Sequence, residues 1–169
     1  MGKQISGSAV LSECGKYRYR LDRVWDESLP RLGWIMLNPS TADGLADDPT
    51  IRRCINYARL HGFGGIVVVN LFAFRSTDPA KIEFVRGIDR ENELHWEQVA
   101  RLCGKVVGAW GKRGFRTIEA QRAIECFRDL DCLGVTSCRE PRHPHYIANV
   151  QELIPFARAG IREEAYRRG

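Results

Sequence analysis

Long apolar runs are missing from this sequence of 169 residues, and none approaches the roughly 18 residues that a membrane-spanning helix requires. The first residues, MGKQISGSAV, also lack the apolar segment of a secretory signal peptide. Both absences argue against helical membrane spans and against secretion. We therefore expect a cytoplasmic protein with no membrane partner, whose thiols stay reduced.

Paired cysteines are missing as well, because none of the six cysteines forms a C-x-x-C pair. One stretch gathers residue types that can bind metals, but its spacing matches no common zinc pattern. That stretch contains Cys126, Cys132, Cys138, His143 and His145. We therefore expect neither a metal ion nor a cofactor.

Acidic residues are the scarcer charge, with 21 Asp and Glu against 26 Lys and Arg, which gives a net charge of +5. A positive charge favours an anionic partner such as nucleic acid. It is equally typical of a slightly basic soluble protein, so charge alone leaves both interpretations open. The composition, 44% hydrophobic and 28% charged, is that of a globular protein. The length predicts one domain over residues 1–169, which we expect to be a monomer.

Short apolar runs alternate with amphipathic patterns along most of the chain. The runs predict strands near residues 33–38, 66–72, 105–110 and 132–136. Apolar residues at helical spacing predict helices over 51–58, 91–103 and 117–128, the first of them started by Asp48 and Pro49. A helical tail, interrupted at Pro155, is expected after the last loop.

The segment before these strands has a different pattern. Apolar and charged side chains alternate over residues 17–22, and Cys14-Gly15 supplies a turn, which predicts an N-terminal β-hairpin. Strands that alternate with helices predict βαβ units and a parallel sheet. The expected fold is α/β: three layers, α/β/α, with a central and mainly parallel four-stranded sheet, plus the hairpin.

Polar or aromatic residues follow each of the four predicted strands. Asn38 ends the first, Asn70 ends the second, Trp110 ends the third, and residues 142–146, RHPHY, follow the fourth. Ligands of open parallel sheets bind beyond the carboxyl ends of the strands. Any one of these loops could be ordinary turn chemistry, but four together predict a binding site at this edge.

The same segments carry a resemblance to a known family. The sequences LNPSTADGLADDPTIRRC, VVNLFAFRSTDP, AWG and PRHPHY together resemble a family of domains of unknown function from bacteria and their phages, domain of unknown function 1643. This resemblance covers most of the chain. It indicates membership more than it indicates an activity.

The strand ends are also similar to those of the uracil-DNA glycosylase superfamily. In that superfamily the first strand ends in GQDPYH or GINPG, the second in Asn, and the third near WG, while the last loop carries HPSP. Leu37-Asn38-Pro39, Asn70, Trp110-Gly111 and His143-Pro144 match these motifs in the same order. The resemblance implies a uracil-DNA glycosylase-like fold and an enzyme that flips a uracil-like or modified base out of DNA and excises it. Such an enzyme would serve repair or antiphage defence.

The resemblance implies roles for the matching residues. His143 would donate a hydrogen bond to the departing base, Asn38 would hold the attacking water, and Asp43 is a candidate general base from the same loop. The residues expected to contact the base are Asn70, Trp110 and Tyr146. Those expected to contact DNA phosphates are Ser40, Arg75, Arg142, Arg52 and Arg53, although the last two could equally form a solvated helix face.

Two departures from the superfamily pattern keep other functions open. Asn38 stands where many members have Asp, and His145-Tyr146 stands where they have Ser-Pro. The first alternative is a nucleic-acid-binding protein on the same fold without catalysis. The second is a hydrolase of free nucleotides or nucleosides.

Overall fold

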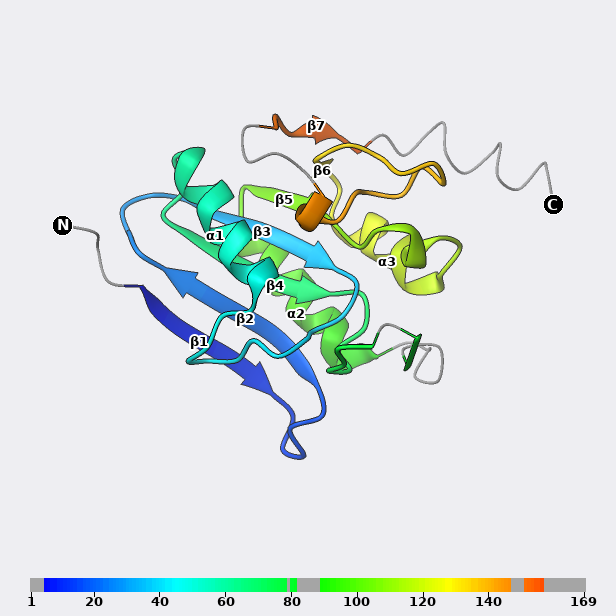
Figure 1. The fold of residues 1–169 in the computed structure, drawn as a ribbon, viewed down its shortest axis with the longest axis horizontal. Coiled ribbons are helices and arrows are strands. Elements are labelled where there is room, and N and C mark those ends of the chain that lie inside the picture. Colours follow the sequence, from blue (N-terminus) through cyan, green and yellow to red (C-terminus); the bar gives the residue numbers. More distant parts are fainter. Residues whose placement is uncertain (1–4, 79, 82–88, 147–150, 157–169) are drawn as a thin grey trace.

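The computed structural model describes residues 5–78, 80–81, 89–146 and 151–156 (Figure 1). Its strands are β1 (Ser6–Leu11), β2 (Arg18–Val24), β3 (Arg31–Met36), β4 (Gly65–Asn70), β5 (Lys105–Gly108), β6 (Leu130–Cys132) and β7 (Ile154–Pro155). Its α-helices are α1 (Pro49–Leu60), α2 (Arg90–Leu102) and α3 (Ile118–Cys126). Short 3₁₀ turns, η2 (Lys112–Gly114) and η3 (Pro144–Tyr146), lie in two of the loops. Within these ranges no helix combines the length and the apolar character needed to cross a membrane.

All seven strands belong to one mixed sheet, in the order β1-β2-β4-β3-β5-β6-β7. The four strands β4, β3, β5 and β6 run parallel to one another. On the two sides of this group, β1 pairs antiparallel with β2, β2 with β4, and β7 with β6. The α/β prediction is therefore confirmed. The predicted extent of the sheet is wrong, because β2 pairs with β4 from Leu21 to Val24 and joins the hairpin to the sheet.

Helices cover both faces of the sheet (Figure 1). Along β4, Ile66 and Val68 belong to the core beneath α1, whereas Val67 and Val69 belong to the core shared with α2 and α3. A strand buried on both faces needs apolar side chains at every position. This requirement explains the uninterrupted run of β-branched residues in GIVVVN.

Each α-helix begins at a side chain that caps its first turn. Asp48 accepts a hydrogen bond from the Ile51 N–H at 2.9 Å, as predicted from the sequence Asp48-Pro49. Asp89 and Thr117 cap α2 and α3 in the same way. The end of α1 is followed by Gly62, whose φ of 79° suits a residue without a side chain beyond Cα.

Two predicted elements differ near the end of the chain. The strand expected over residues 132–136 is β6, which ends at Cys132, because Gly134 has a φ of 108° and the chain turns there. The helical tail is wrong at Ile154–Pro155, which form β7 against β6. Residues 147–150 and 157–169 of the predicted tail lie outside the described residues.

Gly64 gives a direct test of how β2 is joined to β4. A Cβ atom there would lie 2.0 Å from the carbonyl oxygen of Asp26, whereas a Cβ atom at Gly104 would meet nothing within 4 Å. We expect Gly64→Ala to lower the free energy of unfolding by about 1–3 kcal/mol. The control Gly104→Ala should change it by less than about 0.5 kcal/mol. Urea denaturation of both variants measures this, and equal effects would contradict the close approach.

Candidate functional site

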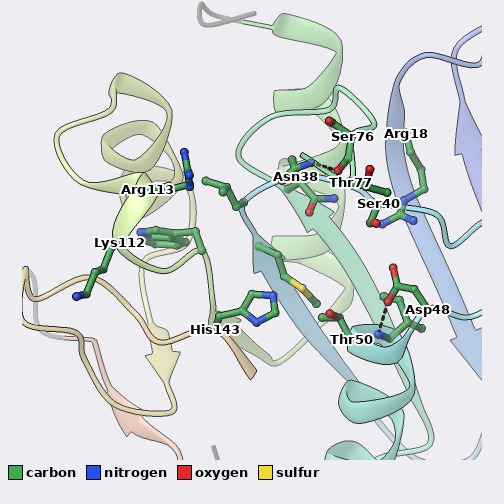
Figure 2. A pocket seen from close by; sticks show the side chains of 15 residues that line it. Arg18, Asn38, Ser40, Asp48, Thr50, Ser76, Thr77, Lys112, Arg113 and His143 are labelled. Carbon is green, nitrogen blue, oxygen red and sulfur yellow. Dashed lines mark hydrogen bonds between the residues drawn. The ribbon is translucent and has the colours of Figure 1, made fainter. Parts of the chain in front are cut away.

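A cavity of about 360 Å³ opens at the carboxyl ends of β3, β4 and β5 (Figure 2). This volume is typical of a site for a small molecule. Its walls come from β2, from the loops after β3, β4, β5 and β6, and from the start of α1. The lining residues are Arg18, Met36, Leu37, Asn38, Ser40, Asp48, Thr50, Ile51, Asn70, Ser76, Thr77, Trp110, Lys112, Arg113 and His143.

Five of the residues predicted for the site line this cavity: Asn38, Ser40, Asn70, Trp110 and His143. Each comes from the end of a strand or from the loop behind it. Parallel pairing aligns these ends, since Met36 at the end of β3 pairs with Asn70 at the end of β4. In Figure 2, His143 lies on one side of the cavity and Asn38 and Ser40 lie on the other.

The orientation of the Asn38 amide is fixed by two carbonyl groups. Its Nδ2 donates to the Ser76 carbonyl at 2.8 Å and to the Pro39 carbonyl at 3.0 Å (Figure 2). An amide oxygen in that place would face two other oxygens, so the nitrogen must occupy it. Oδ1 is therefore the atom with which Asn38 can accept a hydrogen bond from a ligand or a water molecule.

The proton of the His143 imidazole is placed by its own loop. Nδ1 accepts a hydrogen bond from the His145 backbone N–H at 3.2 Å. A neutral imidazole that accepts at Nδ1 carries its hydrogen on Nε2. Burial lowers the pKa of His143, and the neighbouring His145 lowers it further, although Asp48 opposes the shift. At neutral pH, His143 is therefore a neutral ring with Nε2–H as its donor.

Asn70 is held from behind by α2. Its backbone carbonyl accepts hydrogen bonds from the Asn92 amide and from the Trp96 indole, each at 2.9 Å. Its own side chain is buried in the cavity wall, and Nδ2 has no hydrogen-bond partner among the described residues. An unpaired buried donor costs about 1–3 kcal/mol, and a bound ligand with an acceptor atom would remove that cost.

Trp110 forms part of the cavity wall, and contacts with its neighbours hold its ring in place. Its indole Nε1 donates to the carboxyl group of Glu140 at 2.5 Å, and its ring meets Phe156 edge-on. Gly114 packs flat against the same indole, because a Cβ atom there would lie 2.1 Å from the ring. Trp110 is 2% exposed, so most of the ring serves packing and only part of it faces the cavity.

Asp43, which the sequence predicted as a candidate general base, is not among the residues that line the cavity. Its carboxylate accepts hydrogen bonds from the Leu45 and Ala46 N–H groups and so closes a turn. These two hydrogen bonds lower the pKa of Asp43, which makes it a poorer base. Asp48, five residues later, is the carboxylate that lines the cavity.

The predicted phosphate contacts, apart from Ser40, lie elsewhere. The Arg75 guanidinium donates to the Gly15 carbonyl, and the Arg142 guanidinium donates to the Val135 carbonyl in its own loop. Arg52 donates to the Asp47 carbonyl, and neither Arg52 nor its neighbour Arg53 is among the lining residues. The side chain of Tyr146 lies outside the described part of the chain.

Sequence reasoning missed the charged groups that do line the cavity. Lys112 and Arg113 sit in η2, directly after the predicted Trp110-Gly111 motif, and proximity to that motif could have indicated them. Arg18 belongs to the alternating segment of the predicted hairpin and was not predicted as a site residue, yet it is 2% exposed and lines the cavity. Among the described residues, no group of three or more His, Cys, Asp or Glu side chains could hold a metal ion.

One comparison with known proteins gives a match. Residues 18–145 match the family model described as Protein of unknown function (DUF1643). The matched range begins at Arg18 and includes every residue that lines the cavity. No curated protein and no solved structure matches the chain.

The carboxyl group behind Trp110 leads to a pH-dependent prediction. Burial raises the pKa of Glu140, which the hydrogen bond from Trp110 partly offsets. A carboxyl group with a raised pKa in the folded chain stabilises the fold at low pH, and this contribution is lost as the pH rises through the folded-state value. Glu140→Gln keeps an acceptor for Trp110 but cannot ionise.

We therefore expect the free energy of unfolding of Glu140→Gln, minus that of the wild type, to rise with pH across the titration of Glu140 and then to level off. Urea denaturation over about pH 4 to 8 measures this difference. A difference that stays constant over this range would show that Glu140 keeps its ordinary ionisation in the fold.

Proposed function

The chain belongs to the family described as Protein of unknown function (DUF1643), and we propose that it is a DNA glycosylase-like hydrolase, which flips a uracil-like or modified base out of DNA into this cavity and cuts its bond to the sugar. The observation that carries the proposal is the meeting of Asn38, Asn70 and His143 in one cavity. Asn70 ends β4, Asn38 lies in the loop after β3, and His143 lies in the loop after β6. Each offers a polar group suited to one part of the reaction.

The reaction breaks the bond between the base nitrogen and C1′ of the sugar. The base leaves with the bonding electrons, and the sugar becomes a cation resembling an oxocarbenium ion. Water then forms a new bond from its oxygen to C1′, and its proton passes to the base or to solvent. A catalyst of this reaction must stabilise the anionic base and position the water.

The neutral His143 ring suits the first task. Its Nε2–H would donate a hydrogen bond that strengthens as negative charge develops on the base. Because the ring is already neutral and oriented by the His145 N–H, no protonation or reorientation of His143 has to precede this step. Asn70 would bind the edge of the base through the Nδ2 donor that has no partner among the described residues.

The opposite wall suits the second task. Asn38 would hold the water through Oδ1, since its Nδ2 is occupied by the Ser76 and Pro39 carbonyls. An amide cannot remove a proton at neutral pH, so Asn38 positions the water rather than activating it. Asp48, the carboxylate that lines the cavity, would supply negative charge that favours a cationic sugar.

The experiment is a panel of single-stranded and duplex oligonucleotides, each carrying uracil or one modified base. Released base is identified by mass spectrometry, and the abasic site is cut with alkali. The proposal predicts base release from at least one of them. Retention of DNA at low salt without any release would favour the binding protein, and release from mononucleotides alone would favour the nucleotide hydrolase.

His143 gives the first prediction for this reaction. Loss of one donor to a developing anion costs on the order of 10²–10³ in rate, so His143→Ala should lower single-turnover base release by that factor. Binding of the oligonucleotide should change much less. The matched control is His145→Ala, which removes an exposed ring from the same loop and keeps the backbone N–H that binds His143. A full rate in His143→Ala would remove His143 from the mechanism.

The second prediction concerns recognition of the base by Asn70. Asn70→Asp replaces an amide donor with a carboxylate that only accepts hydrogen bonds when ionised. We expect the ratio of kcat/KM values to shift from a base with a carbonyl at that edge towards one with an amino group. Asn38→Asp introduces the same charge into the same cavity and should change the rate but not the ratio. Identical ratios in both variants would show that Asn70 does not bind the base.

A further inference from the structure

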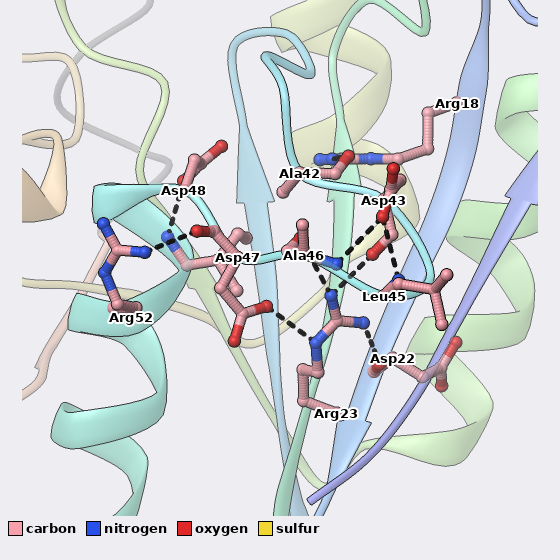
Figure 3. A network of polar contacts seen from close by, with 11 residues as sticks. Arg18, Asp22, Arg23, Ala42, Asp43, Leu45, Ala46, Asp47, Asp48 and Arg52 are labelled. Carbon is pink, nitrogen blue, oxygen red and sulfur yellow. Dashed lines mark hydrogen bonds and ion pairs between the residues drawn. The ribbon is translucent and has the colours of Figure 1, made fainter.

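Two buried arginines on β2 have opposite surroundings (Figure 3). Arg23 forms an ion pair with Asp47 at 2.7 Å, and it also donates to the backbone carbonyls of Asp22, Asp43 and Ala46. Its charge and its donors are therefore matched within the protein. This is the usual state of a buried arginine, because a desolvated charge without partners is costly.

Arg18 lacks these partners. It is 2% exposed and donates one hydrogen bond, to the Ala42 carbonyl, while Nε has no partner and no described carboxylate forms an ion pair with it. Burial lowers the pKa of Arg18 to about 10, with Asp48 and Asp43 opposing the shift from a longer range. The guanidinium is still a cation at neutral pH, and it lines the cavity.

The surroundings of Arg18 in the cavity favour an anion. The N-terminus of α1 lines the cavity at Thr50 and Ile51, and the first turn of this helix contains no acidic residue. The Asp48 carboxylate caps the helix at the Ile51 N–H, so the backbone donor offered to a ligand is the Thr50 N–H. A helix N-terminus carries partial positive charge and favours phosphate groups. The cavity lining as a whole has three cations, Arg18, Lys112 and Arg113, against the one carboxylate of Asp48. Ser40 adds a hydroxyl donor on the side of Arg18 (Figure 2).

We propose that the end of the cavity formed by Arg18, Ser40 and the N-terminus of α1 is a subsite for a phosphate group. Placing an anion there would give the Arg18 charge the counterion that the protein does not supply. We assign this phosphate to the nucleotide whose base fills the cavity, and that assignment rests on the proposed function. The affinity of the subsite for phosphate does not rest on it. Lys112 and Arg113 lie on the opposite side (Figure 2) and are free of this role.

The first test uses the wild-type chain and inorganic phosphate, at an ionic strength kept constant with chloride. The ¹⁵N NMR spectrum reports the Nε–H of Arg18 and the backbone N–H of Thr50. Both resonances should shift along one saturable binding curve as phosphate is added. Shifts confined to exposed cations such as Lys112, or no saturable shift at all, would overturn the subsite and leave Arg18 hydrated by water in the cavity.

The second test compares Arg18→Met with Arg52→Met. Both changes remove one positive charge near the start of α1, but Arg52 is exposed and does not line the cavity. A charge-assisted hydrogen bond accounts for a change on the order of tenfold or more in affinity. Calorimetry should show that loss for phosphate in Arg18→Met and near wild-type affinity in Arg52→Met. Equal affinities in the two variants would overturn the subsite, and if Arg18→Met does not fold, the wild-type NMR titration decides.

The third test separates two carriers of the phosphate. Deoxyuridine, its 5′- and 3′-monophosphates, and a trinucleotide with central deoxyuridine and no terminal phosphate are titrated in turn. Tighter binding of a monophosphate assigns the subsite to a terminal phosphate, and tighter binding of the trinucleotide assigns it to a phosphate within a strand. Either result supports the subsite, and no gain over deoxyuridine in any of them opposes it.

Phosphate binding and base release are measured separately, so the phosphate subsite and the glycosylase activity can fail independently. Phosphate binding that depends on Arg18, without base release from any oligonucleotide, leaves the subsite standing and removes the glycosylase. If the wild type releases a base and the Arg18→Met variant binds phosphate as tightly as the wild type does, the glycosylase stands and the subsite is removed.

Discussion

The parallel pairing of β3 with β4 on one side and β5 on the other is the constraint on which the site depends. It brings the ends of three strands to one edge, in the register that places Met36 beside Asn70 and Ile35 beside Gly108. Parallel strands are stable when both faces are covered, and α1 on one side with α2 and α3 on the other provide that cover. A polar residue that directly follows such a strand therefore lies beyond the core, at the edge of the sheet where the cavity opens.

Some buried polar groups hold the fold, and others face the cavity. Asn92 and the Trp96 indole pair with the Asn70 carbonyl, and Arg23 pairs with Asp47, so these groups fix the positions of strands and loops. Asn70 Nδ2 and Arg18 Nε lack partners and belong to residues that line the cavity. Unpaired donors lower the stability of a fold. Other buried atoms of the described residues also lack partners, among them Trp34 Nε1, Arg75 Nε, Asn92 Oδ1 and His95 Nδ1. Asn70 and Arg18 differ from these because they line the cavity, where a ligand could supply the missing acceptors.

Much of this arrangement could be predicted from the sequence, because periodicity depends on local burial. The runs that became β3, β4 and β5, and the helix started by Asp48-Pro49, follow from residue spacing alone. Strand ends then indicated Asn38, Asn70 and His143 without any knowledge of the loops. The resemblance to the DUF1643 family is confirmed, whereas the resemblance to uracil-DNA glycosylases remains a prediction.

The remaining residues depended on long-range contacts. The alternation over residues 17–22 predicts a strand, but it does not indicate what covers the charged side chains. At Arg18 the cover is the loop after β3, whose Ala42 carbonyl accepts a hydrogen bond from the guanidinium. Asp43 and Asp48 are both acidic residues of one loop, and only the turn closed by the Asp43 carboxylate decides which of them reaches the cavity. Tertiary packing decides which side chains reach the cavity, and the spacing of residues in the sequence does not show that packing.

The proposed reaction is tested most directly by a crystal structure with a short oligonucleotide that carries a non-cleavable analogue of the released nucleoside. We expect one base outside the stack and inside the cavity, with its edge about 3 Å from the Asn70 amide and a second acceptor facing Nε2 of His143. A base that stays stacked in the oligonucleotide, with only solvent between Asn38 and His143, would contradict the proposed reaction.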